Sequence, residues 1–163
     1  MQSDRQREIG KRVHLSAHLL ELRTLVGREV ASQDILSLEQ TDALQAASRT
    51  IPKSPNAICS LPFEAKAHKS FAALIGELEA LRPGPVLLWT SHSSDCGVLE
   101  VESIARINFD FPYAVNSTGT IAVTTRDCRD KMILDFSENS NGQRVIDIEL
   151  YGSSWARAKL PVQ

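Results

Sequence analysis

Several features that mark particular protein classes are missing from this chain of 163 residues. Its three cysteines, Cys59, Cys96 and Cys128, are widely spaced and odd in number, and no CxxC pair occurs. A disulfide framework and a structural zinc knuckle are therefore both disfavoured. No run of apolar residues approaches the roughly 20 that a membrane-spanning helix needs. We accordingly expect no membrane segment.

Motifs that bind nucleotides or activate a serine are also absent. The chain contains no GxGxxG or GK[ST] phosphate loop and no GxSxG nucleophile turn, so we expect no cofactor. The charged stretch 1–12 leads into no apolar block of the signal-peptide type. We therefore interpret the protein as cytoplasmic.

The charge is unevenly distributed along the chain. Residues 1–82 contain 11 Lys and Arg against 10 Asp and Glu, a balance of +1, whereas residues 83–163 contain 7 against 10, a balance of −3. A protein that binds nucleic acid needs the opposite sign on its working surface. Direct nucleic-acid binding is disfavoured, and a basic protein partner is compatible with the excess acid.

The first half of the chain has helical periodicity. Residues 3–26 carry two apolar stripes, which predict a helix sandwiched between neighbours. The stripes are Ile9, Val13, Ala17 and Leu20, and Leu15, Leu19, Leu22 and Val26. A second helix runs from Gln33 or Leu38 to Arg49, and a capping-box pattern at Ser37 and Gln40 favours the later start.

The second half begins after a proline-rich connector. We divide one domain, residues 1–163, into a helical hairpin (1–50), a connector (51–62) and a helix plus antiparallel sheet (63–163). The spacing predicts a third helix over 63–81 and a buried strand over 86–90. Residues 98–107 fit either a strand or a helix.

Three segments within 119–151 alternate with a period of two, which predicts neighbouring antiparallel strands. Asn141-Gly142 is a strong hairpin signal between the last two. The fold class is therefore α+β, with N-terminal helices packed on one face of a C-terminal antiparallel meander. The residues assigned to the core face are Ile121, Val123, Met132, Leu134, Phe136, Ile146, Ile148 and Leu150.

The other face of this sheet is polar and acidic. It is either a solvated surface or a patch that accepts Lys and Arg from a partner, and a catalytic carboxylate pair ranks third. Apart from the sheet, the aromatic segment 109–113 between elements has the composition of a partner hot spot. The candidate partner-binding residues are Asp135, Asp147, Glu149 and Tyr151 on the sheet, and Phe109, Phe111 and Tyr113 in the segment.

Two further clusters carry chemically active residue types. The loop Ser91–Gly97 contains His92, Asp95 and Cys96, but catalytic groups are usually brought together from distant segments, and neighbours in one loop diverge. His14 and His18 have metal-ligand spacing on a helix, yet no third ligand can be assigned. We therefore predict a polar turn and a solvated helix face, with no catalytic residue and no metal.

Parts of the second half resemble bacterial toxin-immunity proteins, including those of contact-dependent growth inhibition systems. The similar segments are 88–91 (LWTS), 133–136 (ILDF) and 148–155 (IELYGSSW). The resemblance implies a small cytoplasmic protein without enzymatic activity that binds and blocks a cognate toxin. Toxic nucleases have basic substrate clefts, which an acidic inhibitor complements.

Two alternatives stay open at this point. A chaperone or adaptor for a secreted protein has the same size, acidity and mixture of helices and strands. A small hydrolase or transferase that uses the 91–96 loop is the other.

Overall fold

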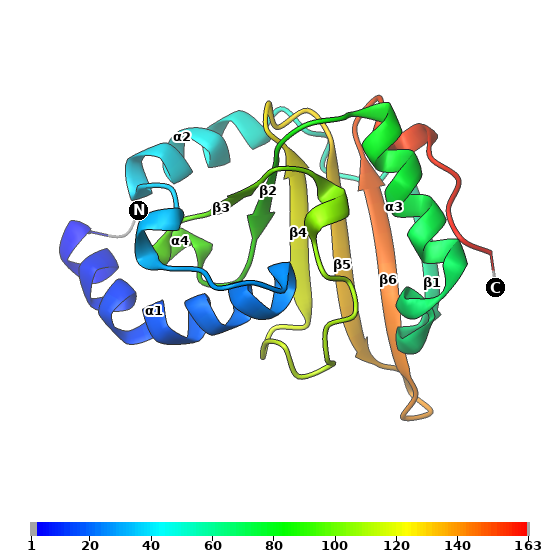
Figure 1. Ribbon diagram of the computed structural model, residues 1–163, viewed down its shortest axis with the longest axis horizontal. Coiled ribbons are helices and arrows are strands. Elements are labelled where there is room, and N and C mark those ends of the chain that lie inside the picture. Colours follow the sequence, from blue (N-terminus) through cyan, green and yellow to red (C-terminus); the bar gives the residue numbers. More distant parts are fainter. Residues whose placement is uncertain (1–2, 163) are drawn as a thin grey trace.

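The computed structural model describes residues 3–162, which form helices packed against a six-stranded antiparallel sheet (Figure 1). The predicted α+β class is confirmed. The helices are α1 (Asp4–Val26), α2 (Leu38–Ser48), α3 (Lys69–Leu81) and the one-turn α4 (Ser93–Cys96). The strands are β1 (Ala57–Pro62), β2 (Val86–Trp89), β3 (Leu99–Val101), β4 (Thr120–Thr125), β5 (Lys131–Glu138) and β6 (Arg144–Tyr151), in the spatial order β1-β6-β5-β4-β2-β3.

The strands β4, β5 and β6 form the meander that the alternation predicts. Leu134 lies opposite Ile121 on one side and Ile148 on the other. All three side chains are at most 1% exposed, because every second residue of each strand turns into the core. Gly142 closes the β5–β6 loop with a φ of 72°, a backbone conformation that favours glycine.

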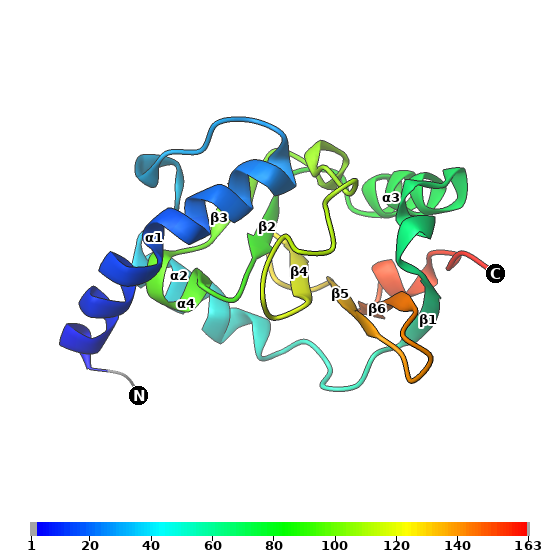
Figure 2. The same cartoon turned by 90° about the horizontal axis from the view of Figure 1, so that it is seen from below.

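The two faces of the sheet are covered unequally (Figure 2). Helices α1 and α3 pack on one face and form the main core with it, through residues such as Leu22, Leu25 and Leu78. Helix α2 lies on the opposite face and covers only its β2 side, where Leu44 packs on Leu87. Beyond α2, the connector that leads to β1 is the only segment of residues 3–162 that crosses this second face (Figure 2).

The first two helices meet through α4 rather than along their lengths. Helix α4 contacts both α1 and α2, and Arg7 of α1 binds Asp42 of α2 at 2.7 Å. The capping box that Ser37 and Gln40 predict is present, so α2 has the later of its two expected starts. No helix within residues 3–162 has the length and apolarity needed to cross a membrane.

The prediction that α1 is sandwiched between neighbours is wrong. Leu22 and Leu25 are fully buried, but Ile9, Val13 and Leu20 are exposed by 54%, 67% and 64%. The sheet and α4 lie on one side of the helix only. The stripe that contains Ile9, Val13 and Leu20 therefore faces solvent, although its spacing is that of a packed surface.

The interpretation of 51–62 as connector alone is incomplete. Its second half forms β1, which pairs with β6 so that Leu61 lies opposite Ile146. Because β1 is an edge strand and Pro62 is its last residue, the proline interrupts no ladder within the sheet. The predicted third helix begins later, at Lys69, after a 3-10 turn at Phe63–Ala67. Residues 98–107 contain a strand, β3, and a second 3-10 turn at Ile104–Arg106.

Candidate functional site

The outward side chains of β1, β6 and β5 form what we call the open acidic face. No helix in the described part of the chain covers this part of the sheet, and the register brings its side chains together in rows across the strands. The residues of the open acidic face are Ile58, Ser60, Ile133, Asp135, Val145, Asp147 and Glu149, and Lys131 of β5 lies at its end, opposite Tyr151.

Two aspartates lie directly opposite each other on this face. Asp135 of β5 is the cross-strand partner of Asp147 of β6. Within residues 3–162 neither carboxylate forms an ion pair, and the contact of Asp135 is a hydrogen bond of 3.4 Å donated by the hydroxyl of Thr120. Like charges at directly opposed positions destabilise a sheet. The free protein therefore holds an unfavourable charge pair, and no basic side chain of residues 3–162 lies within ion-pair distance of it.

Glu149 is in a different situation from the two aspartates. Its Oε2 accepts a hydrogen bond of 2.5 Å from the Tyr151 hydroxyl, and the Lys131 ammonium lies 4.3 Å from the centre of the Tyr151 ring. Burial, together with the Glu149 carboxylate, raises the pKa of Tyr151 to about 12. Tyr151 is only 5% exposed, so the structure places this candidate beneath the surface as a support for Glu149.

Apolar side chains surround the carboxylates. Ile58 is 58% exposed and faces Glu149 across β1 and β6, while Ile133 and Val145 are half-buried. Exposed aliphatic groups contribute apolar area to a protein contact, and carboxylates without an ion pair can complement a partner of opposite charge. Sequence reasoning identified the carboxylates and missed Ile58, because the connector interpretation placed it outside the sheet.

A hollow of about 240 Å³ lies beside Asp135, at the β4 and β2 side of the open acidic face. Its lining includes Thr120, which bonds Asp135, and Trp89, whose indole is fixed by a hydrogen bond of 2.9 Å to Thr124. An aromatic ring next to a carboxylate is a favourable environment for a guanidinium group. The remaining lining residues are Thr90, Ser91, Thr118 and Ala122.

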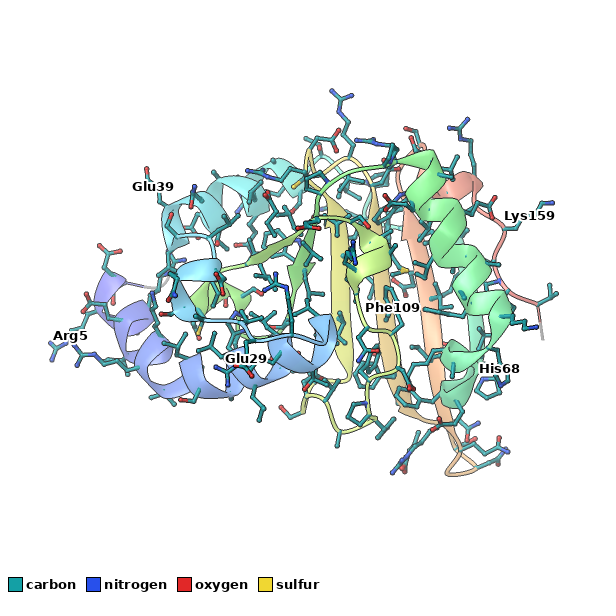
Figure 3. The ribbon with its side chains drawn as sticks, viewed as in Figure 1. Arg5, Glu29, Glu39, His68, Phe109 and Lys159 are labelled. Atoms are coloured by element: carbon teal, nitrogen blue, oxygen red, sulfur yellow. The ribbon has the colours of Figure 1, made fainter. Side chains whose placement is uncertain are left out.

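The aromatic segment 109–113 lies on the other side of the sheet and is mostly core. Phe111 is 1% exposed and packs against Phe136 with ring centroids 5.5 Å apart. The prediction of Phe111 as a partner contact is wrong, because the ring fills the core that the helices close. Phe109 is half-buried against Phe71, and Tyr113 is half-buried in the same cluster (Figure 3 labels Phe109).

The loop 91–97 folds into α4 and packs on α1. The thiol of Cys96 is buried, and this burial raises its pKa, as does the nearby Asp95. A thiol in that state is a poor nucleophile. His92 stacks on His14 with ring centroids 4.5 Å apart, and His14 Nδ1 lies 3.2 Å from Asp95 Oδ2.

His18 corrects the prediction of a solvated helix face. Its ring is fully buried, with Nε2 2.9 Å from the Gly97 carbonyl oxygen and Nδ1 3.0 Å from the Thr90 hydroxyl. A carbonyl only accepts, so Nε2 carries the proton and Nδ1 accepts from the hydroxyl. Burial lowers the pKa of His18 to about 4, which keeps the imidazole neutral. We call His14, His18, His92 and Asp95 the histidine junction.

No group of three or more His, Cys, Asp or Glu in the described part of the chain is arranged to hold a metal ion. The i, i+4 histidine spacing that suggested one instead fixes α1 to the loop after β2. The signal was present in the sequence, but its burial depends on partners more than 70 positions away.

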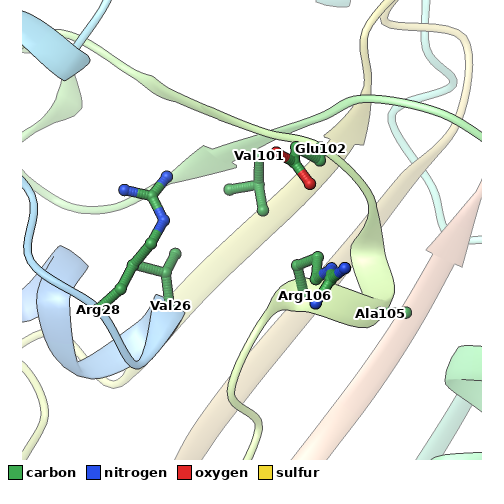
Figure 4. Close-up of a pocket in the computed structure, with 6 residues that line it drawn as sticks. All are labelled: Val26, Arg28, Val101, Glu102, Ala105 and Arg106. Atoms are coloured by element: carbon green, nitrogen blue, oxygen red, sulfur yellow. The ribbon is translucent and has the colours of Figure 1, made fainter.

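A larger cavity of about 500 Å³ lies on the helix-covered side, between the end of α1 and the turn after β3 (Figure 4). Arg28 and Arg106 reach it from opposite sides, with Glu102 nearby (Figure 4). These three side chains are exposed, and Arg28 donates a hydrogen bond to the Glu29 carbonyl oxygen. We read it as a solvent-filled groove between loops.

Comparison with known proteins identifies no relative of this chain. No protein-family model matches the chain, no curated protein matches it, and no solved structure matches it. The functional argument therefore depends on the surface chemistry described above.

Proposed function

We propose that this protein is a non-enzymatic binding protein that captures a basic protein partner on the open acidic face. The observation that carries the proposal is the opposed pair Asp135 and Asp147, which lacks a cation within residues 3–162. A partner that brings Lys or Arg to this pair relieves the repulsion and gains a charge-assisted hydrogen bond.

The surroundings of the pair favour a protein partner over a free cation. Ile58 offers apolar area beside the charges, and the hollow at Trp89 offers a place for one long basic side chain. Buried aromatic and arginine anchors dominate the affinity of protein interfaces. A small ion would use none of these features.

The narrower form of the proposal is an immunity protein that neutralises a cognate, nuclease-like toxin in the cytoplasm. Its support is the resemblance of three segments in the second half and the acidity of a face suited to a basic cleft. The buried Cys96 argues against the alternative of a hydrolase at the 91–96 loop. An adaptor for a secreted protein would use the same face, with an extended segment as its ligand.

The test begins with the partner recovered from the native host and then purified. Its affinity is measured by calorimetry for the wild type and for the double change Asp135→Asn with Asp147→Asn. We expect a loss of more than about tenfold and a shallower salt dependence, because desolvated charge pairs are removed. The matched control is Glu39→Gln with Glu102→Gln, which changes the net charge equally on exposed residues elsewhere.

Two outcomes would count against the proposal. Unchanged affinity of the aspartate variant would exclude the open acidic face as the contact. Equal losses of affinity in both double variants would show that the effect comes from the change in net charge and not from the open acidic face. For the immunity form, the wild type must restore growth to cells that express the partner's toxic domain, and the aspartate variant must restore less.

A further inference from the structure

Helix α1 carries an apolar stripe that no other part of residues 3–162 covers. Ile9, Val13 and Leu20 share one side of the helix, opposite the buried Leu22 and Leu25. Together with Ile58 and Val162, these three are the large hydrophobic side chains that are markedly exposed within residues 3–162. Four of these five side chains therefore lie in two places, the α1 stripe and the open acidic face.

The α1 stripe has a basic flank. Arg5 and Arg12 lie seven residues, or two turns, apart beside the stripe, and both are exposed without an ion pair in the described chain. Arg5 points away from the body at the free end of α1 (Figure 3). The other arginines of the helix are engaged, Arg7 with Asp42 at 2.7 Å and Arg23 with Glu29 at 3.2 Å.

We propose that α1 of one copy of this chain docks on the open acidic face of a second copy. The stripe offers aliphatic groups with unpaired arginines, and the face offers aliphatic groups with unpaired aspartates. Each surface supplies the charge that the other lacks. The same face serves the partner of the proposed function, so self-association and partner binding are mutually exclusive, and the partner must displace the second copy.

The dimensions of the face suit one helix. Strands lie about 4.8 Å apart, so the three strands of the open acidic face together with the neighbouring β4 span roughly 14 Å, and a helix with its side chains is about 10–12 Å wide. Helix α2 bounds this area on the β2 side. A docked helix would complete a third layer that the single chain leaves unfinished.

A symmetric pairing of α1 with α1 is less favourable. An antiparallel two-fold pair turns the same flank of both helices to the same side, which brings arginines next to arginines. The head-to-tail contact has no such repulsion. Because α1 and the open acidic face lie on opposite sides of the sheet (Figure 2), one molecule can use both surfaces at once, and the assembly grows into a ring or an open chain.

The test uses two variants that each lose one surface. Val13→Glu with Leu20→Glu blocks the helix, and Asp135→Lys with Asp147→Lys blocks the sheet. All four positions are exposed or half-buried, so both variants are expected to fold, which circular dichroism melts verify. Sedimentation velocity at low salt is measured for the wild type, for each variant alone and for their equimolar mixture.

We expect wild-type mass to rise with concentration beyond the dimer, and each variant alone to associate more than about tenfold more weakly. The mixture should form a dimer and nothing larger, because one intact helix meets one intact face. A monomeric wild type at every accessible concentration overturns the proposal. So does a sheet variant that still dimerises alone, since that result indicates helix–helix pairing.

The result is separable from that of the proposed function. The helix variant keeps the open acidic face and should bind the basic partner at least as tightly as the wild type. Loss of self-association with retained partner binding supports both proposals. A different outcome is that the mixture forms dimers while the sheet variant still binds the basic partner. That outcome would support self-association and contradict the proposed partner site.

Discussion

Two pairs of aspartates in this protein differ in whether the chain supplies them with a basic partner. At the β4–β5 turn, Asp130 is fully buried and accepts hydrogen bonds from Arg82 at 2.8 Å and from the backbone of Ser154 at 2.8 Å and Trp155 at 2.9 Å. Its neighbour Asp127 also binds Arg82. Asp135 and Asp147 on the open acidic face have no basic side chain within ion-pair distance in residues 3–162.

The difference separates charge that serves the fold from charge that does not. A carboxylate that the fold depends on is supplied with donors by its own chain, because burying it otherwise costs several kcal/mol. The pair on the open acidic face receives no such supply and repels itself. We infer that the basic groups which complement this pair come from the surface of a binding partner.

The largest expected effect concerns Asp130, and the comparison fails if the fold is equally stable without its carboxylate. Asp130→Ala should destabilise the fold by about 3–5 kcal/mol, because it leaves two buried backbone N–H groups without their acceptor and leaves Asp127 as the remaining carboxylate that binds Arg82. Urea denaturation followed by circular dichroism measures the change. Asp127→Ala is the control, and we expect a cost near 1 kcal/mol or less because its side chain is 42% exposed. Equal costs at the two positions would contradict the distinction.

The two faces of the sheet provide the next comparison. Ile148→Ala on the covered face should cost about 2–5 kcal/mol, because its fully buried side chain leaves a cavity. Ile133→Ala on the open acidic face should cost less than about 1 kcal/mol, because its side chain is half-buried and the vacated space is open to water. Similar losses from chemical denaturation would mean that the second face is packed as well.

His18 extends the comparison to a group that is buried in its neutral form. Its pKa falls from an ordinary value of 6.5 to about 4 on folding. The stability it supports is therefore complete above pH 6.5 and is lost as the pH falls from 6.5 through 4, by about 3 kcal/mol in all. The free energy of unfolding, measured across this range, should decline more steeply in the wild type than in His18→Gln. Parallel slopes would exclude His18 as the titrating group.

The sequence predicts the covered face well and the open one incompletely. Alternation in β5 and β6 places Leu134 and Ile148 on one face and both aspartates on the other, and it also restricts the register. A two-residue turn at Asn141-Gly142 would oppose Asp135 to Ile148, which would put a core residue and a solvent residue on one side. The longer loop, closed by Asn139 and Gln143, restores the match.

Other parts of the structure have no local signal in the sequence. The edge strand β1 is obscured by the prolines around it and becomes a strand only because β6 is available for pairing. The burial of His18 and Phe111 depends on segments far away in the chain. The spacing of the stripe on α1 is that of a packed surface, and a single sequence cannot reveal that no other element of residues 3–162 covers it.

The smallest effect is the most specific one. Asp135→Asn removes one of two opposed charges and preserves the shape of the side chain. We expect the free protein to become more stable by a few tenths of a kcal/mol, because cross-strand repulsion is relieved at a solvated surface. The gain should be larger at low ionic strength and should fade as salt screens the pair.

Thermal melts at two salt concentrations measure this gain, and Asp147→Asn should reproduce it. The double variant should add nearly nothing beyond either single change, because one substitution already removes the repulsion. Glu102→Gln, an exposed carboxylate outside the helices and strands, is the control and should leave stability unchanged. If the single aspartate changes instead weaken the fold, the pair contributes to folding, and the argument that it is held for a basic surface loses its basis. A more stable fold with weaker binding of the basic surface is the combination expected of charges retained for an interface.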